Sequence, residues 1–185
     1  MKTIFFTLLF IPLFSGIFFI SVNPVIFPNV KEIPSVMKKN NQSLFYIERS
    51  KNKNRVYYDA NINANGKLDV EQPIDVYWLN LEENYGKRGE LSYIQEKLAY
   101  GYKSVKISDK LFEIKLKAFD KRPINLLIDN KGKIKAQIKI QGKQALLHHL
   151  FIKAIDKGLA TSVQYIELFG TDIYTKTEVY EKIIP

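Results

Sequence analysis

Alternation of apolar and polar residues is the feature that most constrains what this chain can fold into. Between positions 133 and 141, Ile and Ala occupy every even position, whereas Lys and Gln occupy every odd one. A period of two places the apolar residues on one face of a β-strand and the polar residues on the other. Residues 112–118 follow the same pattern, with Phe112, Ile114 and Leu116 opposite charged neighbours. The chain is therefore predicted to build half-buried strands.

Short apolar segments separated by turn residues predict the rest of the sheet. Further strands are expected at residues 44–49, 55–62, 74–79, 124–129, 145–155 and 163–169, and the tail at 174–184 fits either strand or helix. The pair Asn65-Gly66 predicts a type I′ hairpin turn, which needs positive φ at both central residues. Helices between strands are missing, so a parallel α/β fold is excluded.

One helix is predicted near residues 90–101. Leu91, Ile94 and Leu98 repeat at helical spacing, and Ser92 with Gln95 fits a capping box at the N-terminus. Gly101 is expected to take the left-handed conformation just past the end. Together these elements predict an all-β, mostly antiparallel fold, either a β-sandwich or an up-and-down barrel of about eight or nine strands.

The N-terminal segment is apolar and lies outside the predicted β-domain. After Lys2, residues 4–20 are almost all Phe, Ile and Leu. Residues 1–30 are therefore predicted to be an apolar helix that serves as a signal peptide or an N-terminal membrane anchor. A polar linker at 31–43 would precede a β-domain at 44–185. We expect a periplasmic or cell-envelope location, with residues 4–22 as the tether to the inner membrane if the segment is retained.

The net charge of +9 comes from lysine, because only four of the 28 basic residues are Arg. Nucleic-acid readers favour Arg, whose planar fork pairs with bases and phosphates, so no nucleic acid is expected as a partner. Lysines that alternate with apolar residues are expected to form one positive sheet face that suits an anionic membrane surface: Lys106, Lys115, Lys117, Lys133, Lys135 and Lys139. The alternative is a solvated face.

Aromatic residues supply the candidate binding site. Seven of the 11 Tyr lie between positions 57 and 102, together with the single Trp. Tyr combines an apolar ring with a polar tip, which suits a small apolar or saccharide ligand. The predicted pocket or rim contains Tyr77, Trp78, Tyr93 and Tyr100, with Arg88 and Lys103 as nearby charges for an anionic group. The competing interpretation assigns these rings to the core and surface.

Catalytic and metal signatures are weak. Hydrolase-elbow, metalloprotease and phosphate-loop motifs are missing from the sequence, and zero Cys excludes thiol and Cys-ligated centres, so no cofactor or metal is predicted. Asp75, Glu96 and His148 are the acid/base candidates if the protein is an enzyme. His148 and His149 are expected on opposite faces of one strand. The Asn-rich stretch 61–72 resembles a calcium loop but lacks Asp at position one and Glu at position twelve, which favours a polar loop.

Several stretches of the chain resemble an uncharacterised bacterial family catalogued as domain of unknown function 4833. The resemblance runs from Leu44 to the C-terminus and rests on residues 45–50, 54–58, 73–78, 93–95 and 98–101. Its most specific parts are Pro-Ile-Asp-Val-Tyr-Trp and Ala-Tyr-Gly. The family has no assigned activity, so the resemblance supplies no site residues. It implies a small bacterial domain behind an N-terminal export segment.

These observations favour a non-enzymatic envelope domain that binds a ligand or partner. Two alternatives stay open. One is an envelope enzyme that acts on a sugar or lipid. The other is a structural module whose Lys-rich face rests against the membrane.

Overall fold

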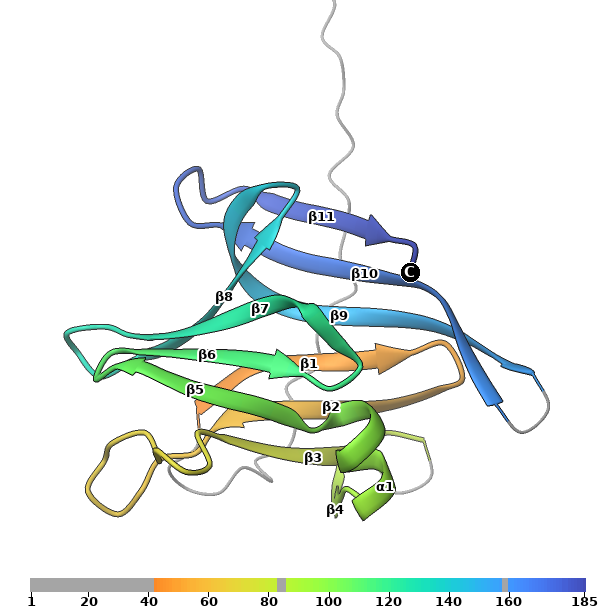
Figure 1. The fold of residues 1–185 in the computed structure, drawn as a ribbon, viewed down its shortest axis with the longest axis horizontal. Coiled ribbons are helices and arrows are strands. Elements are labelled where there is room, and N and C mark those ends of the chain that lie inside the picture. Colours follow the sequence, from red (N-terminus) through yellow and green to blue (C-terminus); the bar gives the residue numbers. More distant parts are fainter. Residues whose placement is uncertain (1–41, 83–85, 158–159) are drawn as a thin grey trace, which may run out of the picture. The chain divides into compact units, whose positions relative to one another are not determined.

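The computed structural model describes residues 42–82, 86–157 and 160–185 (Figure 1). Strands and one short helical segment alternate along these residues as β1 (Gln42–Arg49), β2 (Asn52–Ala60), β3 (Ile74–Asn80), β4 (Lys87–Glu90), α1 (Tyr93–Gln95), η1 (Glu96–Tyr100), β5 (Tyr102–Ser108), β6 (Leu111–Leu116), β7 (Phe119–Ile128), β8 (Ile134–Ile140), β9 (Lys143–Lys157), β10 (Ala160–Asp172) and β11 (Glu178–Ile183). The predicted N-terminal apolar helix and nearly all of the linker lie outside the described residues.

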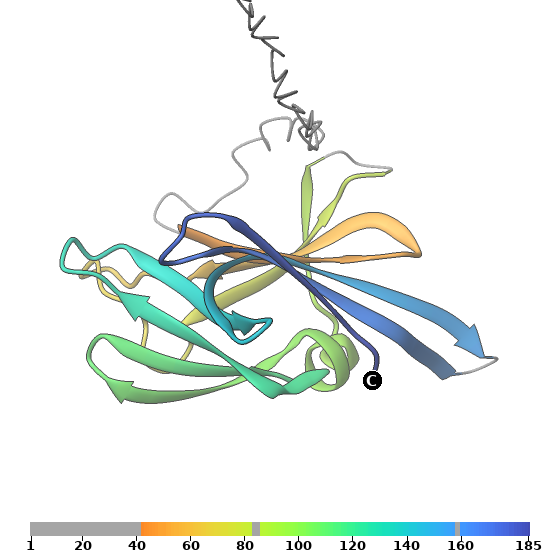
Figure 2. The same cartoon turned by 90° about the horizontal axis from the view of Figure 1, so that it is seen from above.

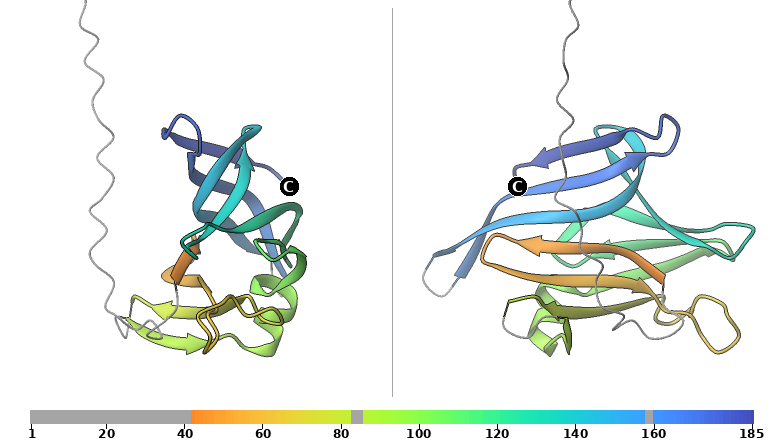
Figure 3. Two further views of the ribbon diagram at one scale, coloured as in Figure 1. Left: turned by 90° about the vertical axis from the view of Figure 1, so that its left-hand side faces the viewer. Right: turned by 180° about the vertical axis from the view of Figure 1, so that it is seen from behind.

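The strands form one sheet curled into a half-barrel (Figures 1 and 3). Nine strands follow one another in the order β4-β3-β2-β1-β9-β8-β7-β6-β5, and β10 and β11 continue from β9. β1 and β9 pair in parallel, and the other described pairs are antiparallel. The all-β, mostly antiparallel prediction is confirmed, but the sheet is neither a two-layer sandwich nor a closed barrel.

The long strand β9 explains this shape. Residues 143–146 of β9 pair with β8, residues 149–152 pair with β1, and β10 runs along residues 145–157. A strand has two edges, so β8 and β1 share the edge that β10 leaves free. From there the sheet divides into two arms, β1-β2-β3-β4 and β8-β7-β6-β5. Figure 2 shows these arms diverging from β9.

The inner faces of both arms make the core. Ile134, Ala136, Ile138 and Ile140 are all buried, as their alternation predicts. In the other arm Phe45 stacks on Tyr58 with ring centroids 4.5 Å apart. These buried side chains form the hydrophobic core on the inner faces of the described arms. The intervening polar residues point outward, so lysines 115, 135 and 139 lie on the outer faces of β6 and β8. Lys106 of β5 stands opposite buried Phe112 on the inner side, so its predicted place on the same face is wrong.

The helical segment begins as predicted and ends differently. The capping box is present: Ser92 accepts a hydrogen bond from the N–H of Gln95, whose side chain accepts one from the N–H of Ser92. Residues 96–100 then widen into a π-helical turn. Ile94 and Leu98 are 67% and 68% exposed, so of the predicted apolar helix face only Leu91 packs against the core.

The predicted role of Gly101 is wrong. Its φ of −66° and ψ of 172° are extended values that any residue adopts. Glycine is needed here for space, because a Cβ atom would lie 2.1 Å from the carbonyl oxygen of Glu96. That oxygen accepts the hydrogen bond from Gly101 N–H that closes the last turn, at 2.9 Å.

Two other local predictions are settled by the structure. Gly66 has φ of 72°, but Asn65 is not among the residues of positive φ, so the type I′ hairpin prediction is wrong. The turn instead lies inside a longer loop between β2 and β3, which the bridge between Ile62 and Leu68 closes. The tail at 174–184, predicted as strand or helix, forms strand β11 from Glu178 to Ile183, after a turn.

No helix in residues 42–82, 86–157 and 160–185 has the length and apolar character that a membrane span requires.

Candidate functional site

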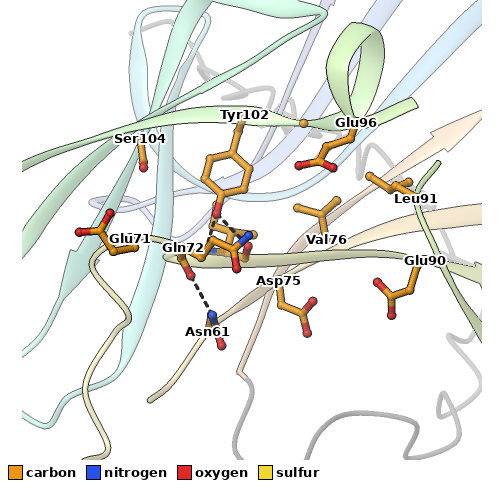
Figure 4. A pocket seen from close by; sticks show the side chains of 12 residues that line it. Asn61, Glu71, Gln72, Asp75, Val76, Glu90, Leu91, Glu96, Tyr102 and Ser104 are labelled. Atoms are coloured by element: carbon orange, nitrogen blue, oxygen red, sulfur yellow. Dashed lines mark hydrogen bonds between the residues drawn. The ribbon is translucent and has the colours of Figure 1, made fainter. Parts of the chain in front are cut away.

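The two arms of the sheet approach each other at β3 and β5 without backbone pairing. Instead, the hydroxyl of Tyr102 accepts a hydrogen bond from Ile74 N–H at 3.0 Å and donates one to Ile74 C=O at 2.8 Å. Figure 4 shows Tyr102 reaching from β5 to the β3 backbone. We call this gap the seam, bounded by residues 74–76 of β3 and 102–104 of β5. The Tyr102 side chain thus forms the backbone hydrogen bonds that a neighbouring strand would otherwise form with Ile74.

A pocket of about 390 Å³ lies at the seam. Four carboxylates line it: Glu71 from the β2–β3 loop, Asp75 from β3, Glu90 from β4 and Glu96 from η1. The described lining contains no Lys, Arg or His, although the whole chain carries +9. Burial raises the pKa of Tyr102 to about 12, and the charges of nearby acids including Asp75 and Glu96 add to that rise. The pocket therefore has a negative potential.

Two of the acid/base candidates predicted from sequence line this pocket, namely Asp75 and Glu96. Sequence reasoning missed Glu71, Glu90 and Tyr102 as site residues. Their convergence depends on a contact between β3 and β5, and no local motif signals that contact.

Asp75 is held by Arg88 on the outer side of β3 and β4. The Arg88 guanidinium donates to both carboxylate oxygens of Asp75, at 3.1 and 2.9 Å, and its Nε donates to Glu90 at 3.0 Å. It also lies over the Tyr77 ring, 4.0 Å from the centroid. Burial lowers the pKa of Arg88, but the hydrogen bonds and charges of Asp75 and Glu90 together raise it by more, and the net shift is upward. The predicted pair Tyr77 and Arg88 is therefore brought together.

A buried carboxylate, which sequence reasoning missed, extends this group. Asp59 is fully buried and accepts a hydrogen bond from the Tyr77 hydroxyl at 2.9 Å. It stands opposite Asp75 in the register of β2 and β3. Burial raises the pKa of Asp59, and the bond from Tyr77 opposes that rise. Burial and the Asp59 charge together raise the pKa of Tyr77 well above its usual value.

Trp78 and Tyr100 pack together on the inner side of β3. Their rings meet edge to face with centroids 5.2 Å apart. The Arg49 guanidinium lies over both, 4.8 Å from the Trp78 centroid and 5.6 Å from that of Tyr100. Trp78 Nε1 donates to the capping residue Gln95 at 3.3 Å. A cation of the protein itself therefore already occupies the ring faces that were predicted to meet a ligand.

The remaining two predicted ligand residues lie apart from these groups. Tyr93 is 72% exposed on α1, with Lys97 Nζ 5.4 Å from its ring centroid. Lys103 is exposed on β5 and stands opposite Lys115 of β6. The six predicted residues are thus divided between the two faces of β3, strand β4, the helical segment and β5. Their joint role in ligand binding stays a prediction.

Six rings form a row across the outer face of β3, β2, β1, β9, β10 and β11. Their successive centroid distances are 5.8, 5.5, 4.9, 4.3 and 5.2 Å, through Tyr77, Tyr57, Tyr46, His149, Phe169 and Tyr180. Most of these rings stack with nearly parallel planes. These six rings thus stabilise pairing between strands, because each of them packs against a ring on a neighbouring strand.

The prediction that His148 and His149 point to opposite faces is wrong. The register of β9 and β10 shifts between Phe169↔His149 and Gly170↔Leu147, which leaves His148 as the extra residue of a β-bulge. Leu147 and Leu150 both lie in the core, so the two intervening histidines both face outward. Burial lowers the pKa of His149, and the His148 charge lowers it further.

His148 contacts a hydroxyl and a carboxylate. Its Nε2 lies 2.8 Å from Thr171 Oγ1, and its Nδ1 lies 3.5 Å from Glu178 Oε2. Thr171 also donates a hydrogen bond to Glu178 at 3.1 Å, so the three side chains form one connected group. The group is exposed on a sheet face, without an aligned nucleophile and base in an enclosed site. This arrangement does not favour catalysis by His148.

The Asn-rich loop uses its side-chain oxygens internally. Asn63 Oδ1 accepts from the N–H groups of Asn65 and Lys67, and Asp69 Oδ1 accepts from those of Glu71 and Gln72. These bonds are those of a polar loop. Within the described residues, no group of three or more His, Asp and Glu side chains is arranged to hold a metal ion.

Comparisons with known proteins give a family and no characterised relative. No curated protein and no solved structure matches the chain. A family model described as a domain of unknown function, DUF4833, matches residues 45–182, which span nearly all of the described β-domain. The chain therefore belongs to the DUF4833 family.

Proposed function

We propose that this protein is an exported or membrane-tethered domain of the bacterial envelope that binds a cationic ligand or partner in the seam pocket without catalysing a reaction. One observation carries the binding role. A pocket bounded by two strand edges is lined by four carboxylates in a chain of opposite net charge. An amine or guanidinium is the chemistry that matches such a lining.

Two of the carboxylates are available to a ligand. Asp75 and Glu90 already pair with Arg88. Glu71 and Glu96 are exposed and form no ion pair with any described residue. An ion pair with an exposed carboxylate contributes roughly 0–1 kcal/mol. Two such contacts give a ligand modest affinity and a preference for positive charge.

The aromatic residues predicted from sequence contribute little to the lining of the seam pocket. The seam lining contains Tyr102 but none of the aromatic residues predicted from sequence. A small apolar or saccharide ligand at Tyr77, Trp78 and Tyr100 remains a separate prediction. The mostly polar seam favours the cationic ligand.

The location is supported by residues 4–20, whose Phe, Ile and Leu content follows Lys2. Fractionation of cells that carry a C-terminally tagged chain tests it. Recovery in the periplasmic or membrane fraction is expected. Recovery only in the soluble cytoplasm would contradict export and tethering.

A charge-matched titration tests binding. Amide-capped trilysine and triglutamate are added separately to the ¹⁵N-labelled β-domain at low salt, and chemical shifts are followed by NMR. Trilysine is expected to shift the amides of Gln72, Gly101 and Ser104, whereas triglutamate leaves them unchanged. The double variant Glu71→Gln/Glu96→Gln is expected to weaken trilysine binding about tenfold or more, which corresponds to about 1.4 kcal/mol.

The matched control is Asp120→Asn, which removes an exposed carboxylate on β7, outside the pocket lining. Its trilysine affinity should equal that of the wild type. Shifts spread over every acidic residue, or equal affinity in the double variant, would contradict the seam as the binding site.

A second candidate function is an envelope enzyme that acts on a sugar. It is favoured by one observation, the presence of the acid/base candidates Asp75 and Glu96 in the same pocket. Purified peptidoglycan incubated with the protein would then release reducing ends, and Asp75→Asn and Glu96→Gln would each abolish the release. If no reducing ends are released from peptidoglycan, the enzymatic function is contradicted and the binding function remains.

A further inference from the structure

Strand β5 leaves one of its backbone edges without a strand partner in the described part of the chain. It pairs with β6 alone, at the end of the strand order. Lys117 N–H donates to Gly101 C=O at 2.9 Å, in the register that continues through Lys103↔Lys115. Because alternate residues of an antiparallel pair exchange their hydrogen bonds, the intervening residues Tyr102 and Ser104, and then Lys106, direct N–H and C=O away from β6.

The opposite arm contacts this edge through a side chain of β5 and leaves the β5 backbone groups unpaired there. Tyr102 bridges the seam through its side chain, which binds the backbone of Ile74. Within the described residues, the main-chain groups of Ser104 and Lys106 have no hydrogen bond across the seam. An edge of this kind can pair with an additional extended chain, and proteins usually protect such edges.

The two sides of β5 present different chemistry to such a chain. On the inner side Ser104 borders the acid-lined pocket. On the outer side Val105 and Ile107 are 55% and 57% exposed, although both are large and apolar. Cross-strand neighbours on one face of a sheet lie close enough to interact. An added strand would therefore gain from basic residues facing inward and β-branched apolar residues facing outward.

We propose that the free edge of β5 accepts an extended segment of a partner protein as an additional strand. The segment alternates basic residues, which face Glu71 and Glu96, with β-branched apolar residues, which face Val105 and Ile107. The charge preference rests on the proposed function of the pocket, whereas the backbone pairing does not. Backbone bonds give affinity in this mode of recognition, and alternate side chains give specificity.

Methylated peptides test the backbone pairing directly. The probe is the capped peptide acetyl-Lys-Val-Lys-Val-Lys-Val-Lys-amide, and two isomers carry N-methyl groups either on the internal Lys residues or on the Val residues. In an extended chain these two sets of N–H groups point to opposite edges. One isomer is expected to lose at least tenfold in affinity, while the other stays within about threefold of the parent peptide. Equal affinities of both isomers, whether retained or lost, would overturn the proposal.

A pair of substitutions in the protein gives an independent test. Ser104→Pro removes the N–H that faces the seam and keeps the ladder with β6, a position where an edge strand tolerates proline. Ser104→Pro is expected to lower the affinity for the parent peptide at least tenfold. Ser104→Ala keeps the N–H and should therefore keep that affinity. Equal binding by a folded Ser104→Pro variant would overturn the proposal. If that variant does not fold, the methylated peptides still test the backbone pairing.

The same measurements separate the two proposals. Sensitivity to methylation without sensitivity to Glu71→Gln/Glu96→Gln would keep strand addition and contradict cation recognition. The reverse result would keep cation recognition and overturn strand addition. Hydrogen exchange should show new protection at Ser104 and Lys106 with the peptide. Protection that instead rises with protein concentration alone would identify a second copy as the occupant and overturn the proposal.

Discussion

The hydroxyl of Tyr102 forms two hydrogen bonds with the backbone of Ile74, one as acceptor and one as donor, at 3.0 and 2.8 Å. One phenol thereby satisfies both main-chain groups of a residue at a strand edge. These bonds are the point where the two arms of the half-barrel are joined across the pocket. The same tyrosine therefore connects the fold to the candidate site.

Replacement of Tyr102 by Phe should destabilise the protein by about 1–3 kcal/mol. The ring remains, but the N–H and C=O of Ile74 lose their partner in a partly buried place. Urea unfolding followed by circular dichroism measures the change. Tyr174→Phe is the control, because Tyr174 is 78% exposed. A loss for Tyr102→Phe no larger than that of the control would contradict the bridging role.

Gly101→Ala should cost about 3 kcal/mol. The new Cβ would lie 2.1 Å from the backbone oxygen of Glu96, and backbone cannot move aside as a flexible side chain can. Gly89→Ala is the matched control, since its Cβ would meet only Trp78 Cβ at 3.9 Å. Thermal unfolding of the two variants should separate them by several degrees. Similar melting temperatures would show that the π-helical turn adjusts easily.

Local patterns predicted the elements that depend on local physics. The capping box at Ser92 and Gln95 needs only residues three apart, and the alternation of 134–140 needs only one buried face. β5 was missed as a strand because its inward positions include Ser104 and Lys106, so apolar residues do not mark its buried face. The inner face of β5 borders the polar pocket, and its residues are polar for that reason.

Features that depend on contacts between distant residues were mostly missed. The bulge at His148 reverses the expected facing of a histidine, because one extra residue shifts every later side chain to the other face. Asp75 and Glu96 were identified singly as acid/base candidates, but their shared pocket depends on β3 meeting β5. Tyr77 and Trp78 lie on opposite faces of β3, since neighbours in a strand point in opposite directions.

Asp59→Asn should change the dependence of stability on pH. Burial raises the pKa of Asp59 in the folded state, so this carboxyl favours folding below its unfolded pKa and loses that contribution as pH rises through the folded pKa. The asparagine variant keeps an acceptor for Tyr77 and carries no charge. Its stability relative to the wild type should therefore rise between pH 3.5 and 7. Urea unfolding at both pH values measures this, with Asp120→Asn as control. A difference that stays constant with pH would contradict a raised pKa.

Glu181 should behave in the opposite sense. Arg122 of β7 donates to both of its carboxylate oxygens, at 2.7 and 2.9 Å, and Gln141 N–H donates to it at 2.6 Å. These hydrogen bonds lower the pKa of Glu181. The carboxylate therefore stabilises the fold above its unfolded pKa, and this contribution is lost as pH falls through the folded pKa.

Glu181→Gln is accordingly expected to cost about 1 kcal/mol at pH 7, because the pair is partly exposed and its geometry is bidentate. The cost should shrink as pH falls below the usual range of a glutamate, and 0.5 M NaCl at pH 7 should reduce it, since salt screens exposed charges. Urea unfolding of both proteins at pH 7, 4 and 2.5 gives the comparison. The pair joins β7 to β11, two strands far apart in the sheet order. A cost that persists unchanged at pH 2.5 would show that packing of the side chain, and not its charge, joins these strands.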